Sequence, residues 1–393
     1  MKKKILQLIL GSITKTIIIR YQPKIIAVTG SVGKTSTKNT ISFFLEKFFK
    51  VKKSAGNLNT EFGAPLVFLG LEKGGGGSFL EWLKIILIGI KKILIKDKDY
   101  PEIIVVEMGA DKPGDISYLT KIIKPDISVI TMIDENPVHL ANYNNLDELV
   151  FEKAGIIRNL KESGWAIVNS DDQRALQAAG ESKLISFGFN EKNDVKISDF
   201  KYEQEEDRPD GISFSLEHDK EKVSFRLPFC FSKSIAYSVA TALSCFVCLG
   251  IDFKKMPEIS RELKPEENRM NLVKGKAYIL NDVYNSSPAS ALMALEALSS
   301  YQSQRKIAVL GEMKELGEKS VQLHEKIKEK ALESVDVLIT IGDENIWQRK
   351  ENNFPDSEQG ALAINDFKIN QNDLILVKGS RSMKMEKILK AIS

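Results

Sequence analysis

The sequence has 393 residues, enough for two or three domains of about 100–200 residues each. Hydrophobic residues make up 43% and charged residues 28%, a balance that is ordinary for a globular protein, and the net charge is only +3. A nucleic-acid-binding protein usually has a concentrated basic face, so we expect no nucleic-acid partner. Three cysteines cannot form a disulfide framework and fit a reducing compartment, so we expect a cytoplasmic protein.

Two apolar stretches raise the question of membrane association. Residues 1–22 have a basic start and an apolar run that Lys15 interrupts, and residues 79–95 include three lysines and a glutamate. A membrane-spanning helix needs about 20 apolar residues with few charges, so neither stretch is expected to cross a membrane. Both are predicted to be amphipathic helices. They either pack against the protein's own core, which is the interpretation we favour, or make peripheral contact with a membrane surface.

From residue 23 onward, short apolar runs alternate with stretches of helical periodicity. The first strands are predicted at residues 25–29, 103–106, 127–131 and 166–169, with helices at 36–49 and 146–160. This alternation is typical of a parallel sheet with helices on both faces. The stretch 195–227 instead alternates polar and apolar residues around a turn at residues 209–211, which predicts a small antiparallel appendage.

A second α/β alternation begins after residue 265. Its strands are predicted at residues 277–280, 307–310, 337–341 and 374–377, with helices after Pro288, Lys319 and Ser382. We therefore expect an α/β protein with three parts. They are an amphipathic helical segment at 1–22, a central domain at 23–264 with an insertion at 71–100, and a C-terminal Rossmann-like domain at 265–393. The polar segment 262–268 is the predicted hinge.

Residues 29–35, Thr-Gly-Ser-Val-Gly-Lys-Thr, lie between the first predicted strand and the first predicted helix. Glycines in such a loop let backbone amides converge on phosphate oxygens, the lysine reaches the β- and γ-phosphates, and the threonine hydroxyl binds Mg²⁺. The match to the common P-loop pattern is partial, because Val28 stands where that pattern has a glycine. The central domain is therefore predicted to be a P-loop-type ATPase domain with a mostly parallel sheet. Its candidate nucleotide-binding residues are Thr29, Gly30, Ser31, Val32, Gly33, Lys34, Thr35 and Ser36.

Three further residues are weaker candidates. Glu107 follows the predicted strand 103–106, and a carboxylate at the carboxyl end of a parallel strand is well placed to bind the same Mg²⁺. An ordinary strand-end glutamate is the alternative. His139 and Lys153 are unremarkable by themselves, since a lone histidine is more often structural and a lysine on a helix is more often solvated.

A series of motifs resembles those of the Mur ligases, which build the peptide of bacterial cell-wall precursors. In chain order these motifs are residues 29–37, 57–65, 107–110, 113–116, 139–140, 152–156, 169–172, 268–269, 281–288, 309–313 and 315–317. The resemblance extends over roughly residues 23–393, and it is strongest to the Mur ligases that add D-alanyl-D-alanine.

The resemblance implies an ATP-dependent amide-bond ligase of peptidoglycan biosynthesis, with a UDP-linked muramoyl tripeptide and D-alanyl-D-alanine as substrates. The γ-phosphoryl group of ATP would pass to a substrate carboxylate, and an amine would then attack the acyl phosphate. In the implied catalytic set, Lys34 holds phosphates, Thr35 and Glu107 hold one Mg²⁺, and His139 with a carbamate on Lys153 holds a second. Further implied contacts are Asn169, Arg269 and Asp282 for the nucleotide, and Asn59, Thr60 and Asn285 for the substrate. We expect a monomer.

The sequence departs from the family pattern in places. Family members usually have a further N-terminal domain that binds the UDP end of the substrate. Only residues 1–22 precede the first predicted strand here, so we expect that domain to be absent. Lys233-Ser234 replace a common His-Asn near the adenine, and Thr60 replaces a usual asparagine. Two alternatives stay open: a Mur-like or folylpolyglutamate-synthase-like ligase for another carboxylate and amine, and a non-catalytic ATP-binding scaffold.

Overall fold

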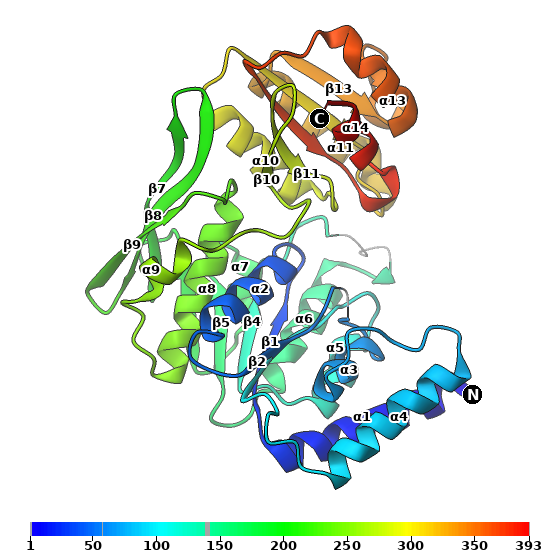
Figure 1. The fold of residues 1–393 in the computed structure, drawn as a ribbon, viewed down its shortest axis with the longest axis vertical. Coiled ribbons are helices and arrows are strands. Elements are labelled where there is room, and N and C mark those ends of the chain that lie inside the picture. Colours follow the sequence, from blue (N-terminus) through cyan, green and yellow to red (C-terminus); the bar gives the residue numbers. More distant parts are fainter. Residues whose placement is uncertain (1, 57, 138–141, 393) are drawn as a thin grey trace.

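The computed structural model describes residues 2–56, 58–137 and 142–392. Two α/β units lie one above the other along the long axis of the molecule (Figure 1). The first contains a nine-stranded sheet of order β2-β3-β1-β4-β5-β6-β7-β8-β9, and the second a six-stranded sheet of order β10-β11-β15-β12-β13-β14. The predicted α/β class, with mostly parallel sheets, is confirmed.

The first sheet is parallel from β2 to β7 and antiparallel beyond it. Its parallel strands are β1 (Lys24–Thr29), β2 (Val51–Lys53), β3 (Ile103–Glu107), β4 (Ile127–Ile130), β5 (Trp165–Asn169), β6 (Leu184–Gly188) and β7 (Val195–Glu205). The strands β8 (Arg208–His218) and β9 (Glu221–Leu227) complete the predicted antiparallel appendage. Because β1 lies between β3 and β4, the loops that follow these three strands meet at one edge of the sheet.

Alternate residues of β1 pack into two different cores, since successive side chains of a strand point to opposite faces. Ile26 and Val28 join the core beneath α2 (Lys34–Leu45) and α8 (Lys233–Leu249). Ile25 and Ala27 join the core on the other face. Among the helices contributing to that second core are α3 (Gly63–Leu69), α5 (Asp115–Ile122), α6 (Leu146–Arg158) and α7 (Gln173–Ala178).

The helices α1 (Lys2–Tyr21) and α4 (Phe79–Leu94) lie side by side at the end of the molecule opposite the six-stranded sheet (Figure 1). Leu10, Ile13 and Ile17 of α1 are buried in the second core, so this helix does pack against the protein itself. α4 buries only Ile85 and Gly89. In the part of the chain that the structure describes, no helix has the length and apolar character needed to cross a membrane.

The second sheet is parallel except for its edge strand β10 (Asn271–Lys274), which pairs antiparallel with β11 (Tyr278–Asp282). The other strands are β12 (Arg305–Gly311), β13 (Val337–Ile341), β14 (Asn353–Phe354) and β15 (Asp373–Lys378). Its helices are α10 (Pro288–Ser300), α11 (Ser320–Ser334), α12 (Glu344–Trp347), α13 (Ser357–Ala363) and α14 (Glu386–Ile392). Short 3₁₀ turns lie at Gly317–Lys319, Ile364–Phe367 and Arg381–Met383. The chain passes from the first sheet to the second through α9 (Met256–Ser260) and the irregular segment 263–268.

Candidate active site

The loop between β1 and α2 needs its two glycines for different reasons. Gly33 has a left-handed φ of 85° where the loop enters α2. Gly30 has a φ of 150°, and a Cβ added there would lie 2.1 Å from the hydroxyl oxygen of Thr131. That hydroxyl donates a 2.6 Å hydrogen bond to the carbonyl of Val32, and the amide of Ser31 donates to the carbonyl of Met132. The chain that follows β4 therefore holds the loop in place.

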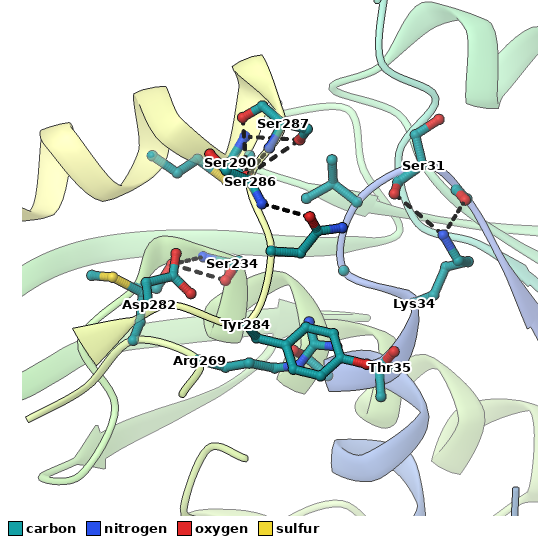
Figure 2. A pocket seen from close by; sticks show the side chains of 18 of the residues that line it. Ser31, Lys34, Thr35, Ser234, Arg269, Asp282, Tyr284, Ser286, Ser287 and Ser290 are labelled. Atoms are coloured by element: carbon teal, nitrogen blue, oxygen red, sulfur yellow. Dashed lines mark hydrogen bonds between the residues drawn. The ribbon is translucent and has the colours of Figure 1, made fainter. Parts of the chain in front are cut away.

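The amine of Lys34 lies against the loop that precedes it. It donates to the carbonyl oxygens of Gly30 at 2.9 Å and Ser31 at 3.3 Å (Figure 2). Burial lowers the pKa of Lys34, and the carboxylates of Glu107 and Asp111 oppose that shift. A cation held this way at a helix N-terminus is suited to bind the phosphates of a nucleotide.

Glu107 and Thr35, the predicted Mg²⁺ ligands, are brought together. The hydroxyl of Thr35 donates a 3.0 Å hydrogen bond to the carboxylate of Glu107, which also accepts one from the side-chain amide of Asn59 at 3.2 Å. Lys38 lies 3.6 Å from the same carboxylate, and both side chains are almost fully buried. Lys38 was not a sequence candidate, although it lies one helical turn beyond Lys34 and so on the same side of α2.

Lys153 reaches the same loop from α6. It is buried, and its amine donates a 3.0 Å hydrogen bond to the carbonyl of Gly30, which Lys34 also contacts. Burial and the nearby charge of Lys34 lower the pKa of Lys153 to about 7, against the opposing effects of Asp111 and Glu152. The solvated lysine expected of an ordinary helix is therefore not what the structure has. His139 lies outside the described residues.

The residues present provide oxygen ligands for Mg²⁺. No group of three or more histidine, cysteine or carboxylate side chains forms a metal cage within residues 2–56, 58–137 and 142–392. Mg²⁺ does not require such a cage, because it commonly binds one or two carboxylates together with water and substrate phosphates. Glu107, Thr35 and Asp111 line one pocket and have the hard oxygen atoms that this ion prefers.

This pocket has a volume of about 290 Å³ and lies between the two sheets. Arg269, Asp282 and Tyr284 line it from the C-terminal unit, and the side chains of Arg269 and Tyr284 extend towards Thr35 (Figure 2). The guanidinium of Arg269 stacks on the ring of Tyr284 at 4.0 Å. Its Nε lies 2.9 Å from the carboxylate of Glu266.

Asp282 is paired with a residue that sequence reasoning missed. The buried amine of Lys378 lies 2.5 Å from its carboxylate and donates to the carbonyl of Asn285 at 2.9 Å. Asp282 and Lys378 end the neighbouring strands β11 and β15, which are in register at this pair. Because these strands are far apart in the sequence, no local pattern indicated the pairing.

The remaining predicted residues fall in three places. Asn59 and Asn285 line the pocket between the sheets. Thr60 does not line this pocket, and its hydroxyl accepts a hydrogen bond from the amide of Gly63 at the start of α3. Asn169 lines a smaller neighbouring hollow behind the loop. Three unpredicted serines, Ser286, Ser287 and Ser290, line the main pocket at the N-terminus of α10 (Figure 2).

Comparison with known proteins gives this geometry a family. The model of the Mur ligase middle domain matches residues 87–235, and that of the Mur ligase, glutamate ligase domain, matches residues 268–381. The chain belongs to the Mur ligases. The family resemblance predicted from the motifs is thereby confirmed, and the chain is a ligase.

Individual Mur ligases are similar over almost the whole chain. The UDP-N-acetylmuramoyl-tripeptide–D-alanyl-D-alanine ligase of Buchnera aphidicola subsp. Acyrthosiphon pisum is 28% identical, with 97% of this chain and 79% of that relative covered. The enzyme of the same name from Bacillus subtilis is 27% identical, with 93% and 75% covered. The MurF ligase from Thermotoga maritima, solved in complex with ADP, superposes with a TM-score of 0.81 at 26% identity, covering 98% of this chain and 82% of that one.

Proposed function

We propose that this Mur ligase uses ATP to join D-alanyl-D-alanine to a UDP-N-acetylmuramoyl-tripeptide during peptidoglycan synthesis. One observation carries the proposal: the similarity to ligases of that name spans both matched domains and runs through the loop at residues 29–35. The cluster of Lys34 with the buried Glu107 and Lys153 at that loop supports catalysis rather than a scaffold role. Monomeric state, cytoplasmic location and peripheral membrane contact stay predictions.

The reaction needs a nucleotide on one side of the pocket and an amine on the other. Lys34 and the loop amides are proposed to hold the phosphates, while Thr35 and Glu107 hold Mg²⁺, which neutralises charge on the transferring phosphoryl group. A substrate carboxylate attacks the γ-phosphorus, the bond to the β-phosphate oxygen breaks, and ADP leaves. The incoming amine then attacks the acyl carbon, loses a proton, and displaces phosphate from a tetrahedral intermediate.

Lys153 is proposed to act as a carbamate. With a pKa of about 7, a substantial fraction of its amine is neutral near physiological pH, and a neutral amine can attack carbon dioxide. The nitrogen–carbon bond forms as one C=O π bond of carbon dioxide opens, the nitrogen loses a proton, and the neutral amine becomes an anionic carbamate with oxygen atoms that can bind a metal ion. This change would add an anionic oxygen ligand to the pocket that Lys153 lines together with Glu107 and Asp111. His139 is proposed as the other ligand.

The nucleotide contacts are proposed from the pocket lining. Arg269 is proposed to meet the phosphates from across the pocket that it lines together with Lys34. Asn169, in the hollow shared with Val32 and Gly33, is proposed to lie near the adenine. Asp282, which lines the same pocket, is proposed to accept a hydrogen bond from a ribose hydroxyl while it pairs with Lys378.

A phosphate-release assay on the purified chain tests the proposal. Release from ATP is expected only when both the UDP-linked tripeptide and D-alanyl-D-alanine are present, and added bicarbonate is expected to increase it. Lys34→Ala and Lys153→Ala are each expected to lower kcat by at least about 10²-fold, since the first removes the cation proposed to hold the phosphates and the second removes the proposed carbamate ligand. Lys121→Ala, which removes an exposed lysine of α5, is the matched control. Release that needs neither substrate, or that follows another carboxylate and amine instead, would overturn the assignment.

A further inference from the structure

The outward face of α4 carries a continuous apolar stripe. Its members are Phe79, Leu80, Leu83, Leu87, Ile90 and Leu94, all exposed. Their spacing of three or four residues after Leu80 places them on one side of the helix, opposite the buried Ile85 and Gly89. Phe79 is 77% exposed and Leu94 74% exposed, so the stripe is open at both ends. Over 16 residues it extends for about 24 Å.

The neighbouring helix α1 has the same character. Its inner side buries Leu10, Ile13 and Ile17, while Ile5, Leu8 and Ile19 are exposed on its outer side. The pair is joined where the hydroxyl of Tyr21, in α1, donates a 2.9 Å hydrogen bond to the carbonyl of Lys92, in α4. The two helices therefore form one firm surface, which we call the α1–α4 face.

Basic residues are enriched in the two segments that form this face. Residues 79–98 contain five lysines and two acidic residues, and α1 contains four lysines, one arginine and no acidic residue. The net charge of the whole chain is only +3, so the rest of the molecule is net acidic. Lys84 and Lys91 are exposed and seven residues apart, which places both along one border of the stripe.

We infer that the α1–α4 face binds peripherally to a membrane surface containing anionic lipids. The apolar stripe would enter the boundary between headgroups and acyl chains with α4 parallel to the membrane, and the lysines would meet the negative headgroups. Both contributions are needed, because a short apolar face alone binds weakly and reversibly. The inference concerns a surface far from the nucleotide pocket and is independent of the proposed reaction.

A second copy of the chain fits this face less well. A two-fold interface pairs a surface with itself, so both copies would bring a strongly basic patch to the same contact. Like charges at an interface disfavour association, whereas an anionic lipid surface is complementary to the patch. The charge of the α1–α4 face therefore favours lipid.

Co-sedimentation of the full chain with vesicles tests the inference. We expect binding to vesicles of phosphatidylcholine mixed with phosphatidylglycerol, little binding to phosphatidylcholine alone, and weakening at high salt. Leu83→Glu combined with Leu87→Glu is expected to abolish binding. Leu332→Glu combined with Leu362→Glu, which changes exposed leucines of α11 and α13, is expected to leave it unchanged.

A charge-reversal pair provides the second test. Lys84→Glu combined with Lys91→Glu is expected to weaken binding to the anionic vesicles at least about tenfold. Lys326→Glu combined with Lys390→Glu, two exposed lysines of the C-terminal unit, is the control.

Absence of binding by the unaltered chain, or equal binding by the variant with Leu83→Glu and Leu87→Glu, would overturn the inference. The inference would also be overturned if sedimentation velocity showed that the unaltered chain is a dimer and that the Leu83→Glu, Leu87→Glu variant is a monomer. Phosphate release with soluble substrates should be the same in all four variants, so a failure of the proposed reaction is separately visible.

Discussion

Two lysine amines, those of Lys34 and Lys153, donate to the carbonyl oxygen of Gly30. Desolvation lowers the pKa of both amines, and the nearby charge of Lys34 lowers that of Lys153 further, so each binds its proton less tightly than a solvated lysine does. These lowered pKa values reduce the free energy of unfolding, because the unfolded chain binds the same protons without the desolvation penalty.

The first prediction concerns the pH dependence that Lys153 creates. Its folded-state pKa of about 7 lies below the ordinary 10.5, so the unfolded chain binds more protons between those values. Stability should therefore rise as the pH increases from about 7 towards 10, and below about 7 the full penalty applies. Urea unfolding in bicarbonate-free buffer should show this rise relative to Lys153→Met, which lacks the group. Parallel pH profiles for the two proteins would refute the shifted pKa.

The second prediction concerns Gly30. Alanine there would place its Cβ 2.1 Å from the Thr131 hydroxyl, at a φ that a side chain rarely adopts. Gly30→Ala is expected to cost about 1–3 kcal/mol in unfolding free energy and to weaken ADP binding, as measured by denaturation and calorimetry. At Gly77 an added Cβ meets nothing within 4 Å, so Gly77→Ala is the control. Unchanged ADP binding by the Gly30 variant would show that the Thr131 contact is not needed for the loop's shape.

Among individual residues, the sequence predicted those whose backbone arrangement is local. Gly30, Lys34 and Thr35 lie in one short motif, and their structure follows from a strand, a turn and a helix in succession. The contacts of Lys38 with Glu107 and of Lys378 with Asp282 join segments that are distant in the chain. No periodicity or spacing carries that information, so these lysines were missed. Family resemblance, rather than physical pattern, singled out Lys153.

Among the elements, strand pairs fix the positions of side chains on the C-terminal side of the pocket. β11 and β15 are adjacent and parallel, and their last paired residues are Asp282 and Lys378. Both side chains are largely buried, so the pair must be hydrogen-bonded to offset the loss of hydration.

The third prediction follows from this pair. Lys378→Met leaves the Asp282 carboxylate without its partner and is expected to destabilise the protein by about 3 kcal/mol in urea unfolding. Adding Asp282→Asn should recover part of the loss, because the uncompensated charge disappears. Lys330→Met removes an exposed pair with Glu333 on α11 and should cost less than about 1 kcal/mol. Strictly additive effects of the two substitutions would indicate that the ion pair contributes nothing.

Element boundaries show where sequence patterns lose information. The helix predicted at 36–49 ends at Leu45, because the apolar residues that follow lie in a turn beside the core. The helix predicted at 146–160 ends at Arg158. The edge strand β10 was not predicted, since its four residues show no clear alternation and depend on β11 for their pairing.

For the molecule as a whole, the main pocket belongs to neither sheet alone. Its lining comes from the β1–α2 loop on one side and from β11, β15 and α10 on the other. The two units also touch where Lys319 donates to the side chain of Asn136 at 3.1 Å. The sequence predicted an α/β unit on each side of a polar connection, but the way the units face each other depends on surfaces that no single segment encodes.

The fourth prediction is that ligands close this pocket. Binding of a non-hydrolysable ATP analogue with both substrates should bring the units together and exclude water from the acyl phosphate. Small-angle scattering should therefore show a smaller radius of gyration than for the free chain. Lys34→Ala, with weakened phosphate binding, should show a smaller decrease at the same ligand concentration. An identical radius in all states would mean that the pocket is already closed.

The α1–α4 face and the six-stranded sheet lie at opposite ends of the long axis (Figure 1). A motion that brings the second sheet towards the β1–α2 loop therefore takes place at the end remote from those helices. If the helices are attached to a surface, the moving unit travels through open water and displaces no lipid. The attached half can stay still while the other half opens to release product, so anchoring and turnover need not compete mechanically.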